Sequence, residues 1–390
     1  MKRPNQSNKP NILVITHPFS NLVGEVMLTN FIDILAPLSG NIFIITGDFT
    51  YTSDRNIYIM KMRGDEKRES MLKRIPKFIL TQLRISFNLI KVSRNTDVII
   101  FSIGAKAFLI PMLLAKSLRK KTLVCTTGLS IRAGEEMYKD RLFGTGKFIL
   151  PRIWEALERI NYSLSDHIAV QSPSIVAYLG LDRYNKKISI ASGRYVDTGL
   201  FDLSIDPKYR ENLIGYIGRL SEEKGVMNFT EAISIVLKKH KEVKFLIGGL
   251  GPLFEKIEYQ LKRYHLGERV RLLGWIPHRE LGRYLNELKV LVLPSYSEGF
   301  PGIVREAMAC GTAVVAVPVG GVPDLIKDGE TGFILEDNSP ECIAGGINRA
   351  LNSPALDLIT NNARALISQE HSYEAAVQGY REIFRKLTNR

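Results

Sequence analysis

The chain has 390 residues, of which 45% are hydrophobic and 24% are charged. This composition is typical of a globular protein and excludes the disordered and fibrous classes. A single hydrophobic core stops growing at roughly 250 to 300 residues, so we expect two domains. The formal net charge of +13 indicates an anionic partner, which could be a phosphorylated substrate, an anionic lipid surface or a nucleic acid.

The cysteines and the apolar stretches favour a cytoplasmic protein. Its three cysteines share no short spacing, as is typical of reduced thiols. Residues 1–10 are polar and lead directly into an apolar run, so no secretory signal is expected. A glycine, a lysine and a proline interrupt the most apolar stretch, residues 98–118. A buried strand followed by a helix explains that stretch better than a membrane span does.

Short apolar runs alternate with longer helical segments along nearly the whole chain, which is the pattern of parallel α/β units. The strands predicted in the first half are residues 11–16, 41–46, 97–103, 121–127 and 166–172. Those predicted in the second half are residues 213–218, 243–249, 269–275, 289–295 and 312–318.

A polar, turn-rich segment at residues 197–212 separates the two halves. We interpret it as the interdomain link and predict an N-terminal domain of residues 1–196 and a C-terminal domain of residues 197–390. The predicted fold class is α/β, with two doubly wound, Rossmann-like domains that face each other across a cleft. Ligands of such sheets bind outside the carboxyl ends of the strands, so the cleft is the expected site.

Glycines and charged residues follow four consecutive predicted strands of the second half. In chain order they are Gly218, Arg219, Lys224, Gly249, Gly251, Trp275 and Glu298. Because the carboxyl ends of parallel strands meet at one edge of a sheet, we expect these residues to share one rim.

Two glutamates flank a predicted helix start in the stretch SEGFPGIVREAMACG, where Glu298 precedes the helix and Glu306 lies about one turn inside it. The N–H groups near residues 299–302 can bind phosphate or sugar oxygens at the positive end of this helix. Arg219 and Lys224 can neutralise a diphosphate. Glu306 can accept hydrogen bonds from ribose hydroxyls, and Glu298 can orient hydroxyls of a sugar. Together these groups match a nucleoside diphosphate-sugar.

Each residue also has a plainer explanation when it is taken alone. Glu306 could pair with Arg305 or another neighbour on a solvated face, and Lys224 could be an ordinary surface lysine. Their joint occurrence at the ends of successive strands favours the functional interpretation.

Residues 213–336 closely resemble the nucleotide-sugar domain of the family 4 retaining glycosyltransferases, which have the GT-B fold. The resemblance is carried by GRL with EKG, GGLGP, LGWIP, LVLPSYSEGFP with REAMACGTAVVA, and GGVPDLIKDGETGFI. It implies that Arg219, Lys224 and Glu298 are the catalytic residues, with the first two on the diphosphate and Glu298 on the transferred sugar. The donor-binding residues that we assign with it are Gly218, Gly249, Gly251, Trp275, Ile276, Gly299, Phe300, Pro301 and Glu306.

The resemblance also implies the reaction, in which a sugar passes from a nucleoside diphosphate-sugar to a hydroxyl acceptor with its anomeric configuration retained. A lipid-linked sugar or another cell-envelope glycan precursor is the acceptor class that we consider first. Retaining members of the family are thought to use a front-face displacement, which requires no protein nucleophile. The sequence has neither a metal-ligand spacing nor an Asp-x-Asp motif, so we expect no metal and no cofactor beyond the donor.

The resemblance is weaker in the first half of the chain. Where many family members have a Gly-Gly loop after the first strand, this chain has only Gly24, and Thr127 and Gly128 stand where a His-Asp pair is common. His17, Gly24 and Thr127 are the predicted acceptor-side residues, although a loop histidine is more often incidental. In this fold the C-terminal helix, here residues 372–387, packs back on the first domain.

Residues 67–94 carry eight Lys or Arg residues, one Glu and apolar residues at helical spacing. One explanation is a basic amphipathic helix that holds the protein peripherally on the inner face of the plasma membrane. The other is a helix that packs on its own sheet with a solvated basic face.

Two other functions stay open. An epimerase or phosphorylase of the same fold would need a different acid/base set or a lysine-bound cofactor. A nucleic-acid-binding protein would spread its charge over base-reading elements with interleaved aromatic residues. The densest charge here lies on one helix beside an apolar face, so we predict no nucleic-acid partner.

Overall fold

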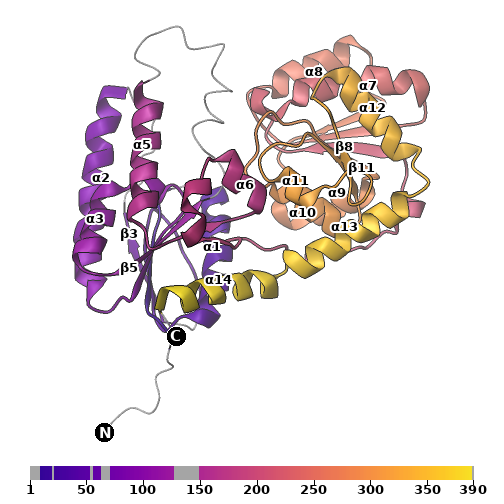
Figure 1. The fold of residues 1–390 in the computed structure, drawn as a ribbon. Helices are drawn as coiled ribbons and strands as arrows, with labels where there is room; N and C mark the ends of the chain where they lie inside the picture. The colour runs from indigo at the N-terminus through magenta and orange to yellow at the C-terminus, as the bar shows by residue number, and fades with distance from the viewer. Residues whose placement is uncertain (1–8, 20–21, 53–55, 63–70, 127–148, 389–390) are drawn as a thin grey trace.

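The computed structural model describes residues 9–19, 22–52, 56–62, 71–126 and 149–388. Two parallel sheets, each flanked by helices, form the molecule (Figure 1). The first sheet has the strand order β3-β2-β1-β4-β5-β6-β7, and the second has the order β10-β9-β8-β11-β12-β13. The predicted fold class, two doubly wound α/β units, is confirmed.

The strands of the first sheet are β1 (Ile12–Ile15), β2 (Ile42–Thr46), β3 (Ile57–Lys61), β4 (Val98–Phe101), β5 (Lys121–Thr126), β6 (His167–Val170) and β7 (Ile188–Ile190). Those of the second are β8 (Leu213–Ile217), β9 (Lys244–Gly248), β10 (Val270–Leu273), β11 (Val290–Leu293), β12 (Ala313–Ala316) and β13 (Phe333–Ile334). The order reverses beside β1 and beside β8, and a doubly wound sheet binds its ligand at that reversal.

All ten predicted strands are present, but β3, β7 and β13 were not predicted. Each of these three is an outer strand of its sheet. An outer strand pairs on one side only and is partly exposed, so it needs no continuous apolar run. The inner strand β1 shows the contrast, since all four of its side chains are fully buried. Leu13 and Ile15 pack on one face of the sheet, and Ile12 and Val14 pack on the other.

Helices cover both faces of each sheet. In the N-terminal half these are α1 (Leu22–Leu35), α2 (Met71–Ser93), α3 (Leu109–Ser117), α5 (Ile149–Leu164) and α6 (Pro173–Tyr178). In the C-terminal half they are α7 (Val226–Lys239), α8 (Phe254–Arg263), α9 (His278–Glu287), α10 (Gly302–Ala309), α11 (Val322–Leu325), α12 (Pro340–Leu351), α13 (Leu356–Glu370) and α14 (Tyr373–Thr388). Helices α2, α3 and α5 lie side by side on one face of the first sheet (Figure 1).

The C-terminal helix α14 runs from the second sheet back to the first (Figure 1). Its Tyr380 is buried, and its ring lies 5.3 Å from the ring of Phe31 on α1. Tyr380 also lies 3.6 Å from the thiol of Cys125 on β5. The last helix therefore completes the core of the N-terminal domain and connects it to the C-terminal half of the chain.

The link segment, residues 197–212, is anchored on the second sheet. The buried guanidinium of Arg210 donates to the carbonyls of Cys310 at 2.6 Å and Leu288 at 2.8 Å. Burial lowers the pKa of Arg210 to about 10, which leaves it charged at neutral pH. Asn286 accepts hydrogen bonds from the backbone of the link at residues 204 and 205. The end of the link thus belongs structurally to the C-terminal domain.

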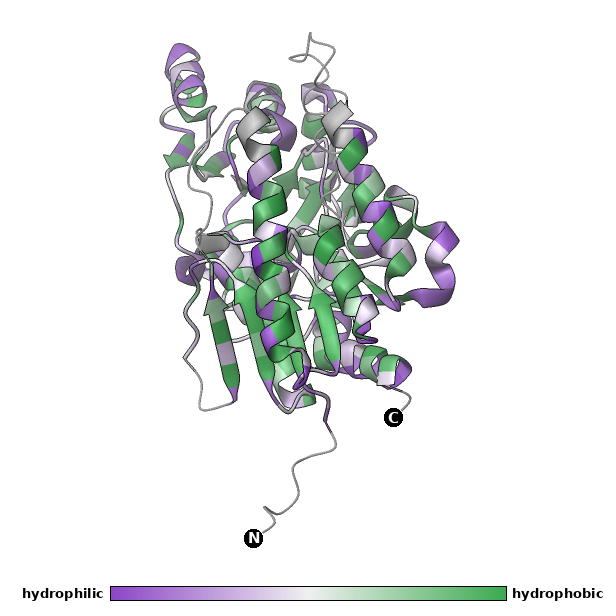
Figure 2. Ribbon diagram, turned by 90° about the vertical axis from the view of Figure 1, so that its left-hand side faces the viewer, coloured by the Kyte–Doolittle hydropathy of each residue, from purple (hydrophilic) through white to green (hydrophobic). Residues whose placement is uncertain are grey.

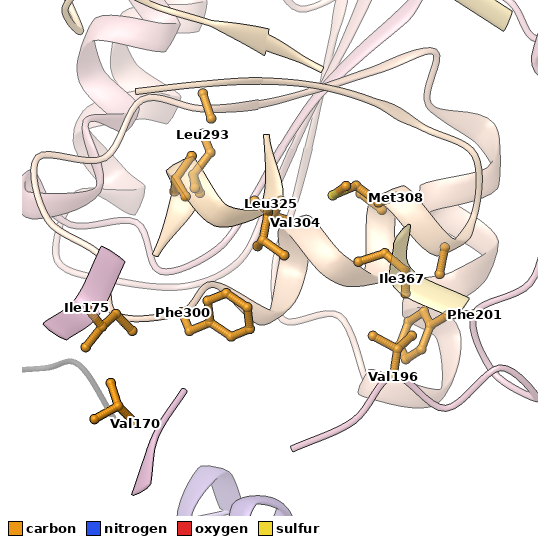
Figure 3. Close-up of a cluster of buried hydrophobic side chains, with 14 of the residues drawn as sticks. Val170, Ile175, Val196, Phe201, Leu293, Phe300, Val304, Met308, Leu325 and Ile367 are labelled. Carbon is orange, nitrogen blue, oxygen red and sulfur yellow. The ribbon is translucent and has the colours of Figure 1, made fainter. Parts of the chain in front are cut away.

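The two domains also meet directly. Apolar side chains of both domains, including Val170, Ile175 and Phe300, form one buried cluster (Figure 3). At its edge the Asp324 carboxylate accepts hydrogen bonds from the backbone N–H and the hydroxyl of Ser174, both at 2.8 Å. This mixture of apolar and polar contacts holds α6 against α11.

His371 lies at this junction, and its burial predicts that stability depends on pH. Burial, followed by the charge of Arg305, lowers the pKa of its imidazole to about 4. Because the unfolded imidazole has a pKa near 6.5, the neutral form is favoured on folding, and this contribution is lost as the pH falls from about 6.5 towards 4. Between pH 7.5 and pH 5, the free energy of unfolding of the wild type should fall by about 2 kcal/mol more than that of the His371→Gln variant. Urea denaturation at the two pH values measures this difference.

The exposed His265 provides the control, since His265→Asn should keep the wild-type pH dependence. Parallel pH profiles for the wild type and His371→Gln would contradict the assignment.

Candidate functional site

The loops after β8 and β11 meet at the reversal of the second sheet. Gly225 has a left-handed backbone (φ 65°), and a Cβ on it would lie only 2.0 Å from the carbonyl oxygen of Pro294. This close approach places Lys224 beside Glu298. The Lys224 Nζ donates to the Glu298 Oε1 at 2.7 Å, and the hydroxyl of Ser295 donates to the same oxygen at 2.7 Å. Two of the predicted catalytic residues therefore form a largely buried ion pair.

Arg219 lies apart from this pair. Its side chain is 70% exposed, and its closest acidic group is Glu223, with 3.7 Å between Arg219 Nη1 and Glu223 Oε1. The hydroxyl of Tyr216 donates to the Arg219 carbonyl at 2.7 Å and fixes the backbone there. The structure thus brings Lys224 and Glu298 into contact and leaves the Arg219 guanidinium at the rim.

Glu306 lies in α10 and is buried, with His278 as its partner. The His278 Nε2 is 3.2 Å from the Glu306 Oε1. The hydrogen bond to this carboxylate raises the pKa of His278. Arg305, the partner that the sequence left open for Glu306, instead lies over the ring of Phe300 at 4.7 Å. Glu306 is therefore held by α9, and it lies on the domain junction and not on a solvated face.

The start of α10 is built by backbone contacts. The first N–H groups of a helix have no acceptor within it, and Pro301, the residue before α10, has no side chain that could accept from them. The N–H of Gly321 donates to the Gly299 carbonyl at 2.7 Å and clamps the turn. The side chain of Phe300 is buried and packs in the apolar cluster between the domains (Figure 3).

Two predicted donor-binding glycines have packing reasons of their own. Gly249 has a φ of 132°, and a Cβ on it would lie 1.9 Å from the carbonyl oxygen of Gly218. A Cβ on Gly251 would lie 2.2 Å from the carbonyl oxygen of Leu220. These contacts join the loops after β8 and β9, so the glycines are required whether or not a ligand binds there.

Two of the predicted donor-binding residues, Trp275 and Ile276, follow the end of β10. Trp275 is 57% exposed on the rim, whereas the side chain of Ile276 packs over Gly248 at the end of β9. The exposed indole leaves an aromatic face available to a ligand.

A cavity of about 100 Å³ lies between the domains beside Glu306. The polar residues that line it include Asn30, Arg194, Asp197, His278, Arg305 and Glu306. Sequence reasoning missed Asn30, Arg194, Asp197 and His278 as site residues, because each belongs to an element far from α10 in the chain and carries no local motif.

The acceptor side is described only in part. His17 follows β1, where its Nδ1 lies 3.0 Å from the Pro18 carbonyl and its ring lies 6.0 Å from that of Phe108. Gly24 packs against the ring of Phe19, where an added Cβ would come within 2.6 Å. Thr127 lies outside the described residues. The acceptor-side assignment stays a prediction.

Two doubly wound domains with the candidate site at the strand ends between them have the GT-B fold. Residues 204–369 match the family described as "Glycosyl transferases group 1". The resemblance of this region to the group 1 glycosyltransferases is therefore confirmed. Membership of the retaining family 4 in particular stays a prediction.

Curated relatives support the same family. The chain is 30% identical over 203 residues to an uncharacterized glycosyltransferase of Methanocaldococcus jannaschii, covering 51% of this chain and 50% of that one. It is 29% identical over 222 residues to the Campylobacter jejuni "GalNAc-alpha-(1->4)-GalNAc-alpha-(1->3)-diNAcBac-PP-undecaprenol alpha-1,4-N-acetyl-D-galactosaminyltransferase", covering 56% of this chain and 59% of that one. The matches thus span about half the length of these relatives.

Solved structures show the fold over nearly the whole chain. Sucrose-phosphate synthase from Thermosynechococcus elongatus has a TM-score of 0.75 at 20% identity, with 98% of this chain and 100% of that chain covered. Anabaena HepE, solved in complex with UDP and glucose, has a TM-score of 0.70 at 16% identity, with 96% and 99% covered. At these identities the likeness establishes the GT-B fold alone.

The glycine contacts predict a large loss of stability on substitution. Gly249→Ala should lower the free energy of unfolding by about 2–4 kcal/mol, because it adds both a disfavoured φ and a clash with the Gly218 carbonyl. Gly267→Ala is the matched control, since nothing lies within 4 Å of its added Cβ, and it should change stability by less than about 0.5 kcal/mol. Equal unfolding curves for the two variants would refute this account of the loop contact.

Proposed function

We propose that the protein is a retaining glycosyltransferase that transfers a sugar from a nucleoside diphosphate-sugar to a hydroxyl acceptor. The observation that carries the proposal is the arrangement around the start of α10, where the Lys224–Glu298 pair precedes the helix and Glu306 lies inside it beside an interdomain cavity. The group 1 domain at residues 204–369 supports it. The HepE structure, which contains UDP and glucose, supports this donor class for the same fold.

The ion pair suggests how the donor is held. Lys224 can turn from Glu298 to a diphosphate oxygen, because it is an ammonium on a flexible stem. Glu298 then keeps its hydrogen bond from Ser295 and has a free oxygen to accept from a sugar hydroxyl. Arg219 is exposed enough to reach the diphosphate from the rim. Glu306, oriented by His278, is placed to accept from ribose hydroxyls.

Catalysis in this proposal depends on positioning and on charge stabilisation. The bond from the anomeric carbon to the diphosphate breaks while the acceptor oxygen forms a bond on the same face, and the acceptor proton passes to a diphosphate oxygen. No protein nucleophile takes part. Lys224 and the N–H groups at the start of α10 stabilise the charge that develops on the leaving diphosphate.

Removing Lys224 tests this role. Lys224→Ala should reduce turnover by about 100-fold or more, because a preorganised charge on the leaving group is lost. Its free energy of unfolding should fall by about 3 kcal/mol, because the buried Glu298 loses its cation but keeps the hydrogen bond from Ser295. The measurements are transfer or donor hydrolysis, with the nucleotide-sugar that most raises the melting temperature in a screen, and urea denaturation.

Lys244 is the matched control, because it also pairs with a glutamate, Glu211, at 2.9 Å. It lies at the amino end of β9, away from the strand ends that hold the site. Lys244→Ala should keep turnover within about twofold of the wild type. Wild-type turnover in Lys224→Ala would refute the proposal.

We further propose a lipid-linked acceptor that the protein reaches while bound peripherally to the inner face of the plasma membrane. The Campylobacter jejuni relative carries undecaprenol in the name of its substrate. Among the described residues, no helix has the length and apolar character to cross a bilayer. Contact with the membrane would therefore be made by the surface of the protein, and α2 offers one.

Helix α2 presents apolar side chains on both of its faces. Ile85 and Leu89 are buried against the sheet. The outer face exposes six large apolar side chains, between 44% and 61% accessible, namely Ile75, Ile79, Leu80, Leu83, Phe87 and Ile90. Packing on its own sheet and contact with a membrane, the two explanations that the sequence left open, are therefore compatible.

The neighbouring helix α5 extends this apolar face. Phe78 of α2 packs on Trp154 of α5, with 4.4 Å between ring centroids, and α5 exposes Ile153 and Ile160. Two long helices with apolar residues along their outer sides face the viewer in Figure 2. Basic residues that include Arg84 and Lys91 are exposed on α2 among them. This mixture of apolar and basic side chains suits an anionic lipid surface.

A flotation assay with vesicles tests the membrane proposal. The protein should float with vesicles that contain anionic lipid, and the double variant Leu83→Ser/Phe87→Ser should lose about 10-fold or more of its partitioning, because two apolar side chains no longer insert. Leu358→Ser is the control, since Leu358 on α13 is as exposed as Phe87 but belongs to the other domain.

Removal of anionic lipid should also weaken flotation, because the basic side chains of α2 then lose their attraction to the vesicle surface. Unchanged flotation of the double variant would refute the proposal. So would a dimer in solution that the same double variant dissociates, because the apolar face would then bind a second copy of the chain.

A further inference from the structure

Two arginines lie together at the domain junction, beside the start of α10. Arg305, in the first turn, is only 2% exposed, and its Nη1 donates to the Arg194 carbonyl at 3.3 Å. The guanidinium of Arg194 lies against Gly302, where an added Cβ would come within 3.2 Å of the Arg194 Nη2. The helix start is therefore flanked by two cations, of which Arg305 belongs to the sequence motif and Arg194 does not.

The acidic groups near these arginines are engaged elsewhere. Glu306 pairs with His278, Asp197 accepts from the backbone N–H of Gly199, and Asp324 accepts from Ser174. Within the described part of the chain, no carboxylate forms an ion pair with Arg194 or Arg305, and the Nε of each is buried without a hydrogen-bond partner. Burial, followed by the charge of Arg194, lowers the pKa of Arg305 to about 9.

This arrangement is unfavourable without a ligand. Two like charges are held close together, and buried N–H donors without acceptors cost free energy. The backbone of Arg194 cannot relax easily, because it is fixed by the hydroxyl of Ser192 and by Arg305. An anion in the adjacent cavity of about 100 Å³, which both arginines line, would remove the cost.

We propose that Arg194 is a third cation for the donor diphosphate, in addition to Arg219 and Lys224, and that it binds the phosphoryl group attached to the ribose. The assignment rests on the proposed function. Glu306, the proposed ribose ligand, lines the same cavity, so the phosphoryl group beside Arg194 is the one nearest the ribose. A guanidinium matches two phosphoryl oxygens, and the free N–H groups at the start of α10 add donors from the other domain.

Arg305 is a positioning residue in this proposal. It holds the Arg194 carbonyl, and its own side chain is fixed over the ring of Phe300. Its positive charge favours an anion beside Arg194 and disfavours an empty site. Donor binding should therefore stabilise the contact between the domains, because it neutralises a repulsion within that contact.

The test compares nucleoside diphosphates with nucleosides by calorimetric titration of the full chain. The probes are UDP and GDP, with uridine and guanosine as the matched ligands that lack phosphate. Arg194→Gln should weaken nucleoside diphosphate binding about 10- to 100-fold, as expected when charge-assisted hydrogen bonds are lost. Nucleoside binding should stay within about twofold. The melting temperature of the free variant should be equal to or above that of the wild type, because a repulsion is removed.

Two further variants complete the design. Arg263→Gln removes one positive charge from α8, outside the cavity, and should bind the diphosphates like the wild type. Arg194→Lys keeps the charge but loses the paired donors, and it should weaken binding about fivefold to tenfold. It also serves as the test if Arg194→Gln fails to fold.

The outcomes separate this inference from the proposed function. If the wild type binds neither nucleoside diphosphates nor nucleotide-sugars, the proposed function fails and the inference fails with it. If the wild type and Arg194→Gln bind them equally, the inference alone is overturned. If inorganic phosphate binds the UDP-saturated wild type and not Arg194→Gln, the anion belongs to the acceptor, and the donor assignment is overturned.

Discussion

The ion pair between Lys224 and Glu298 joins the two strands between which the order of the second sheet reverses. The loops that carry it touch through the backbones of Gly225 and Pro294, an approach that only a glycine permits. A carboxylate and an ammonium that are largely withdrawn from water stabilise each other only with good geometry, and Ser295 completes that geometry. Because the pair occupies the place where the proposed donor must bind, substrate binding has to exchange protein contacts for ligand contacts.

At the junction between the domains, ligand binding would likewise exchange protein contacts for ligand contacts. Apolar packing around Phe300 and the hydrogen bonds from Ser174 to Asp324 hold the domains together. The arginines beside the start of α10 oppose that contact, because their like charges lie close together and neither forms an ion pair with a carboxylate of the described residues. The junction thus combines a stable apolar cluster with a local electrostatic cost. A ligand with phosphoryl groups would remove the cost without disturbing the cluster, which gives a physical reason for binding between the domains.

The positive charge of the protein is concentrated in more than one region of the molecule. Part of it lies in the cleft, where Lys224, Arg194 and Arg305 surround the start of α10. Another part lies on α2, beside apolar side chains that no described element covers. In the proposed function these two regions bind different anions, a soluble donor diphosphate and a lipid surface. The N-terminal domain would then bring the enzyme to its acceptor while the C-terminal domain supplies most of the donor contacts.

The sequence alone determined the two doubly wound domains and the residues at the strand ends, because buried parallel strands require continuous apolar runs and glycines mark close backbone contacts. It also placed Glu298 and Glu306 around one helix start, since both lie within a single local motif. Only the tertiary structure decided that Glu306 pairs with His278, that Arg219 stays at the rim and that Arg194 lies against Gly302. These contacts join residues from distant parts of the chain, so no local sequence pattern predicts them. The outer strands β3, β7 and β13 were not predicted from the sequence. These strands are partly exposed, so they lack the continuous apolar runs that mark the inner strands.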